Sequence, residues 1–261
     1  MSQCEPQFLN VGDDGRRIAV LHDDGADPGL LWLGGFKSDM IGTKAAALSD
    51  WAKAHGHRCT RFDYSGHGWS DGPFEDGTIS RWAEEALAVF DTFCTGPTIA
   101  IGSSMGGWIA LLLAKAHLAA VGADKSRLAG LVLVAPAPDF TERLMWADFP
   151  DEIRKLIMET GRYEEPSEYS DEPYLITRGL IEDGRNNLVM DEPVKTGCPV
   201  HILQGMEDPD VPWRHAHELF TKLATDDAIF TLVKDGDHRL SRPQDIERLL
   251  AAVAGLVEGR D

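Results

Sequence analysis

Residues Thr98 to Trp108 (T-I-A-I-G-S-S-M-G-G-W) join a buried strand to a helix through one sharp turn. The apolar run 99–101 is typical of a strand. It stops at Gly102, and an apolar pattern with helical spacing follows almost at once. Ser104 lies in the turn, two residues from Gly102 and two from Gly106, and these glycines let strand and helix approach closely around a strained serine. The turn predicts a candidate nucleophile, Ser104, at a helix N-terminus, where backbone N–H groups favour negative charge.

Apolar segments of two kinds alternate along most of the chain. Short runs bounded by Gly, Asp or Pro are typical of strands, and longer segments with helical periodicity follow them. The run from Leu128 to Ala135 is apolar nearly throughout, as expected of a parallel strand covered on both faces. The alternation predicts an α/β fold with a doubly wound, mostly parallel sheet. The expected strands are 16–22, 30–33, 58–62, 99–101, 128–135, 200–203 and 228–233, and the expected helices are 42–55, 80 to about 93, the segment after Ser104 to about 120, 213–223 and 243–257.

Residue types at the helix ends predict where some of these helices begin and stop. We expect Thr43 to cap the first helix, Gly56 to end it, and Ser80 to begin the second helix.

The alternation of strands and helices breaks between residues 139 and 195. This insert contains an amphipathic segment from Asp151 to Glu159 and a polar, proline-containing run after it, so we expect a mostly helical cap. The predicted organisation is a core in two parts, 1–138 and 196–261, interrupted by the cap 139–195. The insert has 15 acidic and 7 basic residues and so holds −8 of the net charge of −18. If that charge faces a cleft, we expect it to repel polyanions such as acyl-coenzyme A at low salt.

The net charge and the hydrophobic pattern exclude several classes of partner. A charge of −18 argues against nucleic acid, because phosphate binding depends on clustered Lys and Arg. No apolar run approaches the roughly 18 residues that span a bilayer, so we expect no membrane insertion. The sequence has no metal-ligand spacing, no P-loop and no G-x-G-x-x-G pattern, and we expect neither a metal nor another cofactor.

Cysteine usage indicates a reducing compartment. Cys4, Cys59, Cys94 and Cys198 are far apart and form no C-x-x-C pair, which favours free thiols over disulfides. The first residues lack the basic and apolar regions of a signal peptide. We therefore expect a cytoplasmic protein.

A serine hydroxyl attacks efficiently when an adjacent base takes its proton and a carboxylate holds that base in the right tautomer. The strand expected at 200–203 is followed by Q-G-M-E-D-P-D-V-P, from which we choose Asp208 as the acid, with Asp210 and Glu207 as alternatives. The last expected strand is followed by K-D-G-D-H-R-L, from which we choose His238 as the base. The carboxyl ends of parallel strands meet at one edge of a sheet, so these loops can reach Ser104.

The other histidines fit different roles. His22 and His201 lie in expected strands, where we expect structural hydrogen bonds, and His67 lies in a glycine-rich loop that can line a cleft. The histidines that we expect to be solvated are His55, His57, His117, His215 and His217.

An oxyanion formed by attack on a carbonyl needs two N–H donors. The N–H of Met105, directly after the serine, is the first candidate. The second candidate is the N–H of Phe36, in the loop Gly34-Gly35-Phe36 that follows an expected strand.

The blocks G-S-S-M-G-G-W, G-M-E-D-P-D-V-P and G-D-H-R occur in this order, and with them the chain resembles the α/β-hydrolase superfamily over nearly its whole length. The blocks G-F-K-S-D-M-I-G-T-K-A and R-F-D-Y-S-G-H-G-W-S-D-G, together with G-S-S-M-G-G-W, are similar to those of the mitochondrial palmitoyl-protein thioesterases, also described as acyl-glucuronide esterases. The resemblance implies an α/β-hydrolase fold with Ser104 as nucleophile, Asp208 as acid and His238 as base. It also implies S-acyl-cysteine thioesters or acyl esters as substrates. No mitochondrial targeting segment is evident, and the insert is the least similar part.

The sequence therefore predicts a serine hydrolase that cleaves carboxylic esters or thioesters, of small molecules or of S-acylated proteins, through an acyl-enzyme. Two alternatives remain open. The same three side chains can serve carbon–carbon bond hydrolysis or a peroxidase-like reaction, or the fold can be a binding module without turnover. Within the insert, Arg143, Arg178 and Arg185 are candidates either for binding a substrate carboxylate or for exposed ion pairs.

Overall fold

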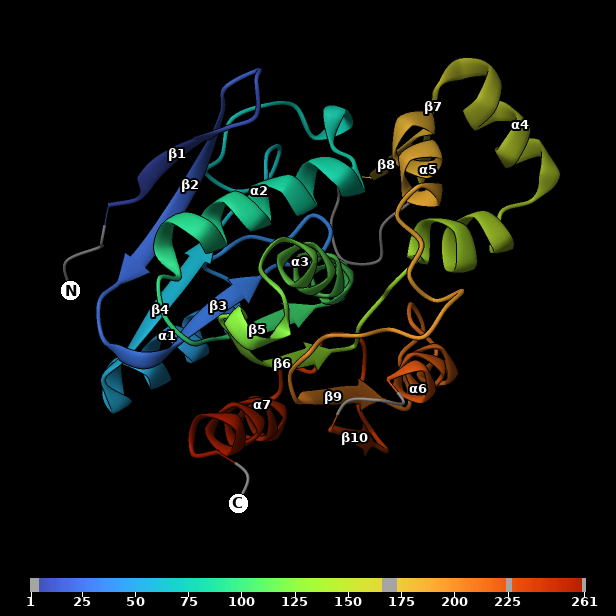
Figure 1. Ribbon diagram of the computed structural model, residues 1–261. Helices are drawn as coiled ribbons and strands as arrows, with labels where there is room; N and C mark the ends of the chain where they lie inside the picture. Colours follow the sequence, from blue (N-terminus) through green and yellow to red (C-terminus); the bar gives the residue numbers. More distant parts are fainter. Residues whose placement is uncertain (1–4, 166–172, 224–226, 260–261) are drawn as a thin grey trace.

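The computed structural model describes residues 5–165, 173–223 and 227–259, and its centre is an eight-stranded sheet (Figure 1). The strand order is β1-β2-β4-β3-β5-β6-β9-β10. β2 is antiparallel to both of its neighbours, and the other neighbouring pairs are parallel, which confirms the predicted mostly parallel sheet. The strands are β1 (Gln7–Val11), β2 (Arg16–Asp23), β3 (Ala26–Leu33), β4 (His57–Phe62), β5 (Thr98–Ser103), β6 (Leu128–Val134), β9 (Val200–Gly205) and β10 (Ala228–Val233).

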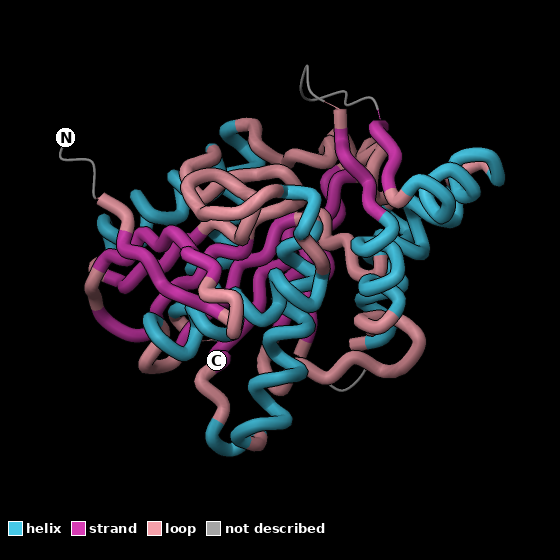
Figure 2. The backbone as a smooth tube through the Cα atoms, turned by 90° about the horizontal axis from the view of Figure 1, so that it is seen from above, coloured by secondary structure: helices cyan, strands magenta, loops and turns pink. Residues whose placement is uncertain are grey.

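Helices cover both faces of this sheet, as Figures 1 and 2 show. α2 (Ile79–Phe93), α3 (Met105–Val121) and α6 (Trp213–Lys222) contribute to one hydrophobic core, and α1 (Thr43–His55) and α7 (Pro243–Val257) contribute to the other. Successive residues of β3 alternate between these cores. Leu31 and Leu33 enter the first, and Leu30 and Trp32 enter the second. Side chains on a strand alternate between faces, so a sheet covered on both sides needs apolar residues at every position.

The structure differs from the expected elements at three places. β1 was not expected, because Q-F-L-N-V mixes polar and apolar residues, yet it pairs antiparallel with β2. Thr43 is the first residue of α1 and not its cap. The cap is Gly42, which makes no side-chain hydrogen bond, while Gly56 ends the helix in a left-handed conformation as expected. α2 begins at Ile79, and the side chain of Thr78 accepts the N–H of Arg81, so the threonine before the expected start satisfies the helix end.

The insert lies beside the core, near the right of Figure 1. Its helices are the π-helical segment η3 (Thr141–Trp146), α4 (Asp151–Thr160) and α5 (Arg178–Arg185). The expectation of a mostly helical insert missed two strands, β7 (Arg162–Glu165) and β8 (Tyr174–Thr177), which pair antiparallel. β7 (R-Y-E-E) is charged, and β8 (Y-L-I-T) is only four residues long, so neither gives a strong strand signal. The rest of the polar run, residues 166–172, lies outside the described residues.

The two ends of the insert are joined by one buried carboxylate. Asp139 is fully buried and has a φ of 57°, a backbone conformation that Asp and Asn tolerate better than most residues. Its side chain accepts the N–H groups of Val189 at 2.8 Å and Met190 at 2.9 Å. Arg143 lies 3.4 Å from the same carboxylate. The chain therefore leaves the core and returns to it at one hydrogen-bonded point.

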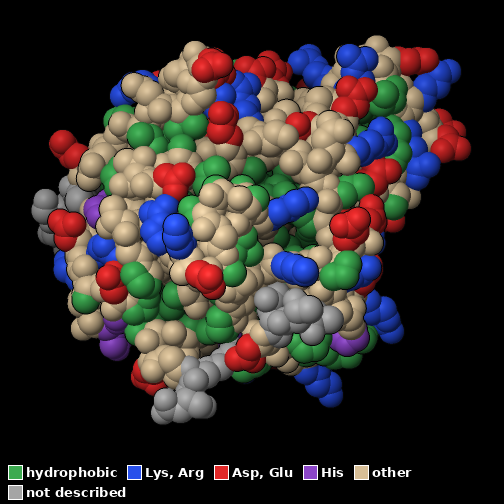
Figure 3. Space-filling view, in the orientation of Figure 1, with side chains coloured by type: hydrophobic (Ala, Val, Ile, Leu, Met, Phe, Trp, Pro, Cys, Tyr) green, Lys and Arg blue, Asp and Glu red, His purple; other side chains and the backbone are tan. Residues whose placement is uncertain are grey.

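Charged side chains of both signs are interspersed on the face that Figure 3 shows. Among the described residues, no helix combines the length and the apolar character that crossing a bilayer demands.

Asp139→Ala should lower the free energy of unfolding by about 3 kcal/mol, because it leaves the partly buried N–H of Val189 and the buried N–H of Met190 without acceptors. Urea denaturation of the purified protein measures the change. The matched control is Asp191→Asn, which removes the charge of the most exposed of the three acidic partners of Arg143. It should change stability by about 1 kcal/mol or less. Equal stability of Asp139→Ala and the unmodified protein would contradict the role of this carboxylate.

Candidate active site

Ser104 lies on the turn between β5 and α3, with φ 54° and ψ −118°. The glycines around it are required by close backbone approach. A Cβ atom at Gly102 would lie 2.3 Å from the carbonyl oxygen of Gly106. A Cβ atom at Gly106 would lie 2.0 Å from the carbonyl oxygen of Leu33. A real Cβ cannot occupy either place, so both glycines are needed for α3 to start directly above β3 and β5.

The structure brings Ser104, His238 and Asp208 together from three separate loops. The Nε2 atom of His238 lies 3.1 Å from the Oγ atom of Ser104, and its Nδ1 atom lies 2.8 Å from the Oδ2 atom of Asp208. An ionised carboxylate only accepts hydrogen bonds, so the Nδ1–H group donates to Asp208. The lone pair of Nε2 then faces the Ser104 hydroxyl. The three side chains form a continuous line along which a proton can move from Ser104 to His238.

Asp208 is held in place by its own loop. Its side chain is fully buried, and its Oδ1 atom accepts the N–H groups of Asp210 at 2.9 Å and Val211 at 2.8 Å. The amide of Gln204 donates to Oδ2 at 3.0 Å. These bonds compensate the cost of burying a carboxylate and leave Oδ2 pointing at the imidazole. Of the three carboxylates considered for the acid, Asp208 is the one at hydrogen-bond distance from His238, while Asp210 lines the cleft.

The turn Gly35–Ser38 presents the N–H of Phe36. The carbonyl of Gly35 accepts the Ser38 N–H at 3.1 Å and the Ser38 hydroxyl at 2.9 Å. Because the peptide group is planar and trans, the Phe36 N–H points the opposite way from this carbonyl. The turn lies close to the serine, since a Cβ atom at Gly35 would lie 3.4 Å from Ser104 Cβ. Met105 is the first residue of α3, and Phe36, Met105 and Ser104 line the same cleft.

The cleft has a volume of about 1260 Å³ and two kinds of wall. The insert contributes mostly apolar side chains to the lining, and the core contributes polar side chains together with apolar ones such as Phe36 and Phe74. Burial lowers the pKa of Lys44, in the polar part, to about 8. Burial, and then the negative charge of Asp210, raise the pKa of Glu165. The apolar residues from the insert are Phe140, Leu144, Met145, Phe149, Ile153, Tyr163, Tyr174 and Leu175, and the polar residues from the core include Ser38, Asp39, Lys44 and Ser241.

Most of the acidic side chains in the described part of the insert do not line this cleft. Among the described residues of the insert, its acidic lining is Asp148 and Glu165, and the core adds the cations Lys37, Lys44 and Arg239. Arg143, Arg178 and Arg185, the candidates for binding a substrate carboxylate, all form ion pairs. Their partners are Asp139, Asp191 and Glu218 for Arg143, Glu182 for Arg178, and Glu142 for Arg185.

Two expectations about histidines are wrong. His117 and His215 were expected to be solvated, but both are buried. His117 accepts the Arg127 N–H, and His215 is bonded to the Pro138 carbonyl, so each is satisfied by a neighbour that its own helical pattern does not reveal. The structural hydrogen bonds expected of His22 and His201 are confirmed. Their partners are the hydroxyls of Thr60 and Thr231.

One group of possible metal ligands lies in the site. Asp208, Asp210 and His238 each place a ligand atom within 4.8 Å of the others. In the structure Asp208 and His238 are bonded to each other, and His238 also faces Ser104, so this geometry suits proton transfer between side chains.

The fold and this arrangement define the class of protein. The family model described as the alpha/beta hydrolase family matches residues 20–252, and the chain belongs to that family. This confirms the α/β-hydrolase fold expected from the resemblance.

Within this family, the chain is similar to particular proteins along nearly its whole length. The human mitochondrial palmitoyl-protein thioesterase ABHD10 is 34% identical over 252 residues, which cover 96% of this chain and 79% of that protein. The mouse alpha/beta hydrolase domain-containing protein 10 has a solved structure that superposes with a TM-score of 0.86 at 31% identity, covering 97% of this chain and 98% of that one. The crystal structure of a protein from Agrobacterium vitis S4 superposes with a TM-score of 0.92 at 52% identity, covering 97% of this chain and 98% of that one. The similarity to the palmitoyl-protein thioesterases noted from the sequence blocks is confirmed.

Gly106→Ala should lower the free energy of unfolding by about 3 kcal/mol or more, because its Cβ atom overlaps the Leu33 carbonyl. The displaced turn should also slow covalent modification of Ser104. Urea denaturation and the rate of labelling by a fluorophosphonate measure the two effects. Gly255→Ala is the matched control. Its Cβ atom meets nothing within 4 Å in α7, and the change should stabilise the helix by about 0.5–1 kcal/mol. A Gly106→Ala protein as stable and as reactive as the control would contradict the packing argument.

Proposed function

We propose that this protein is a serine hydrolase that cleaves carboxylic esters or thioesters through an acyl-enzyme. The observation that carries the proposal is the line Ser104–His238–Asp208, with heavy-atom distances of 3.1 Å and 2.8 Å at the wall of a large cleft. A binding module has no need of a base directed at a serine hydroxyl. The relationship to proteins named as palmitoyl-protein thioesterases supports acyl transfer to water as the reaction.

In the proposed mechanism, Nε2 of His238 takes the Ser104 proton as Oγ attacks the acyl carbonyl. Asp208 keeps the imidazole in the tautomer that can accept this proton and stabilises the imidazolium that forms. The N–H groups of Phe36 and Met105 bind the oxyanion. His238 then gives this proton to the leaving thiolate or alkoxide, which departs as a thiol or alcohol, and water, activated by the same imidazole, releases the acid.

The two walls of the cleft suggest how a substrate lies. The acyl chain occupies the apolar wall built by the insert, because burial there removes hydrocarbon from water. The leaving group lies toward the polar wall that contains Ser38, Lys44 and Ser241. The cleft volume exceeds the roughly 300–1,000 Å³ typical of small-molecule pockets, so an acyl chain and part of a leaving group fit together. We propose acyl esters and S-acyl-cysteine thioesters as substrates.

The expected location in the cytoplasm stays a prediction, since the relatives carry mitochondrial names. Cys59, Cys94 and Cys198 are free and buried, which fits any reducing compartment. Cys4 lies outside the described residues.

Ser104→Ala should abolish labelling by a fluorophosphonate and should lower kcat toward acyl esters and thioesters at least about 1000-fold, because no other group can form the acyl-enzyme. Intact-protein mass spectrometry measures the label, and product release from a panel of acyl chain lengths measures turnover. The matched control is Ser103→Ala, which removes the neighbouring buried serine of the same cleft wall and should keep full labelling. A folded wild-type protein that takes no label would overturn the proposal, and turnover of diones without turnover of esters would favour carbon–carbon bond hydrolysis.

Asp208→Asn should lower kcat about 10⁴-fold with little change in KM, because an amide at this position favours the wrong imidazole tautomer. Asp210→Asn, two residues away, should keep kcat within about tenfold. Steady-state kinetics with one ester substrate compare the two variants. If the larger loss followed substitution of Asp210, the assignment of the acid would be wrong.

A further inference from the structure

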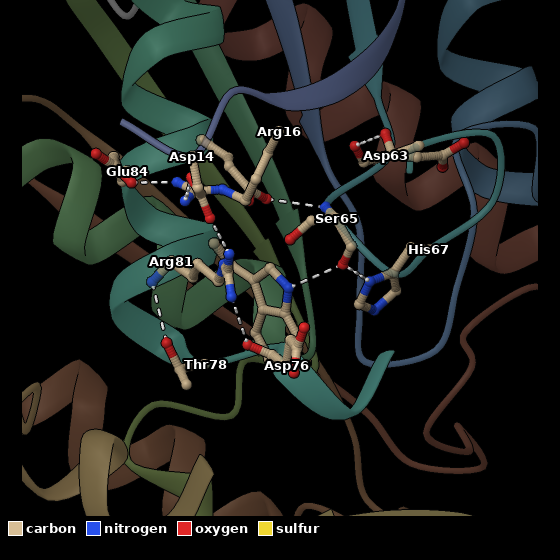
Figure 4. Close-up of polar contacts among 12 residues, drawn as sticks. Asp14, Arg16, Asp63, Ser65, His67, Asp76, Thr78, Arg81 and Glu84 are labelled. Atoms are coloured by element: carbon tan, nitrogen blue, oxygen red, sulfur yellow. Dashed lines mark hydrogen bonds and ion pairs between the residues drawn. The ribbon is translucent and has the colours of Figure 1, made fainter. Parts of the chain in front are cut away.

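His67 lies in the wall of the cleft and makes two directed hydrogen bonds. It is 4% exposed, in the loop between β4 and α2. Its Nδ1 atom lies 3.1 Å from the carbonyl of Ser65, and its Nε2 atom lies 3.1 Å from the backbone nitrogen of Lys37. Figure 4 shows the imidazole and its bond to Ser65. His67 takes no part in the proposed proton transfer or in binding the oxyanion.

The bonding partners define the protonation state of this ring. The Ser65 carbonyl is an acceptor, so Nδ1 carries the hydrogen and donates to it. The Lys37 N–H is a donor, so Nε2 must be unprotonated and accept. Burial lowers the pKa of His67 to about 4, and the ring is therefore neutral at neutral pH, as both bonds require.

The loop that carries His67 is itself anchored. The Ser65 carbonyl also accepts the indole N–H of Trp82 at 3.2 Å, and the Ser65 N–H donates to the buried carboxylate of Glu85 at 2.9 Å. Glu85 pairs in turn with Arg16 at 2.7 Å. The rings of Tyr64, Phe74 and Trp82 pack around the imidazole. His67 is a rigid acceptor because its position and its tautomer are both held by neighbours.

The backbone N–H of Lys37, which donates to His67, lies in the turn Gly35–Ser38. Lys37 has a φ of 55°. Left-handed backbone at the third position of a turn usually belongs to glycine, so this conformation is strained for lysine. The bond from the Lys37 N–H to His67 stabilises that conformation. The Phe36 N–H belongs to the preceding peptide group of the same turn and depends on the turn keeping its shape.

We propose that His67 is a positioning residue. By accepting the Lys37 N–H, it holds the turn Gly35–Ser38 in the conformation that directs the Phe36 N–H toward the oxyanion formed at Ser104. This inference rests on the proposed hydrolase function and on Phe36 as an oxyanion donor.

The test compares two substitutions of His67. His67→Asn keeps a donor near the Nδ1 position but has no acceptor that reaches Lys37, whereas His67→Gln can place its side-chain oxygen near the Nε2 position. His67→Asn should lower kcat about tenfold or more, a part of the hundred- to thousandfold loss typical of removing an oxyanion donor, with KM within about twofold. His67→Gln should recover much of that loss.

A second measurement separates a misplaced donor from a damaged fold. A thionoester replaces the carbonyl oxygen with sulfur, a larger and weaker hydrogen-bond acceptor, so an intact oxyanion hole prefers the oxygen ester. His67→Asn should reduce this preference by about the same factor as kcat. A fold defect would slow both substrates equally, and that result would contradict the proposal.

Relieving the backbone strain at residue 37 gives an independent test, in which kcat is compared between two double variants. The comparison holds even where His67→Asn lowers the stability of the protein, because both double variants carry that substitution. In the His67→Asn background, Lys37→Gly should raise kcat severalfold, because glycine adopts the left-handed conformation without help. Lys37→Ala removes the same side chain and keeps the strain, and it should give no recovery. Equal kcat in the Gly and Ala double variants would overturn the proposal.

Ser104→Ala separates this inference from the proposed function. An inactive Ser104→Ala protein beside a His67→Asn protein with wild-type kcat and substrate preference contradicts the role of His67 alone. Turnover that survives in Ser104→Ala contradicts both.

Discussion

The close approach of three backbones around Ser104 is the constraint on which the rest of the site depends. Gly106 lets the start of α3 touch the end of β3, and Gly102 lets the same helix start above β5. The serine is therefore held by backbone packing within the sheet and not by its own side-chain contacts. The strained backbone conformation of Ser104 persists only because many surrounding contacts fix it. The buried strands β3, β5 and β6 provide those contacts.

Three buried carboxylates hold the loops around this centre, and each does so by accepting two backbone N–H groups. Asp63 accepts the N–H groups of Met40 and Trp69, Asp139 accepts those of Val189 and Met190, and Asp208 accepts those of Asp210 and Val211. Burial raises the pKa of Asp63 and of Asp139, while the N–H groups oppose that rise. Each carboxylate costs free energy to bury and recovers it by satisfying backbone donors that a loop cannot satisfy alone. Loop shape in this protein thus depends on a few charged residues beneath it.

The parts that could be predicted from the sequence are those set by local pattern. The parallel sheet follows from short apolar runs such as Leu128–Val134, and Ser104 follows from its flanking glycines. The positions of His238 and Asp208 follow because parallel strands bring their carboxyl ends to one edge. What the sequence did not predict depends on partners distant in the chain. His215 is hydrogen-bonded to the Pro138 carbonyl, 77 residues away, and the pairing of β7 with β8 joins two four-residue strands, one of them charged, whose partnership no local pattern reveals.

The insert and the turn at Phe36 are one packed unit, and in the proposed function this packing links substrate selection to chemistry. The Phe36 ring packs against Phe140 and Tyr174 of the insert and against Phe74 of the core. The Lys37 ammonium donates to the Pro173 carbonyl at 2.9 Å. The backbone of the same turn is bonded to His67 on its other side. Because the turn lies between the insert and the core, a change in the insert that moves Tyr174 also moves the peptide groups beside Ser104. In the proposed mechanism, selectivity for the acyl chain and the rate of attack on the carbonyl therefore share one set of contacts, and neither can be altered without regard to the other.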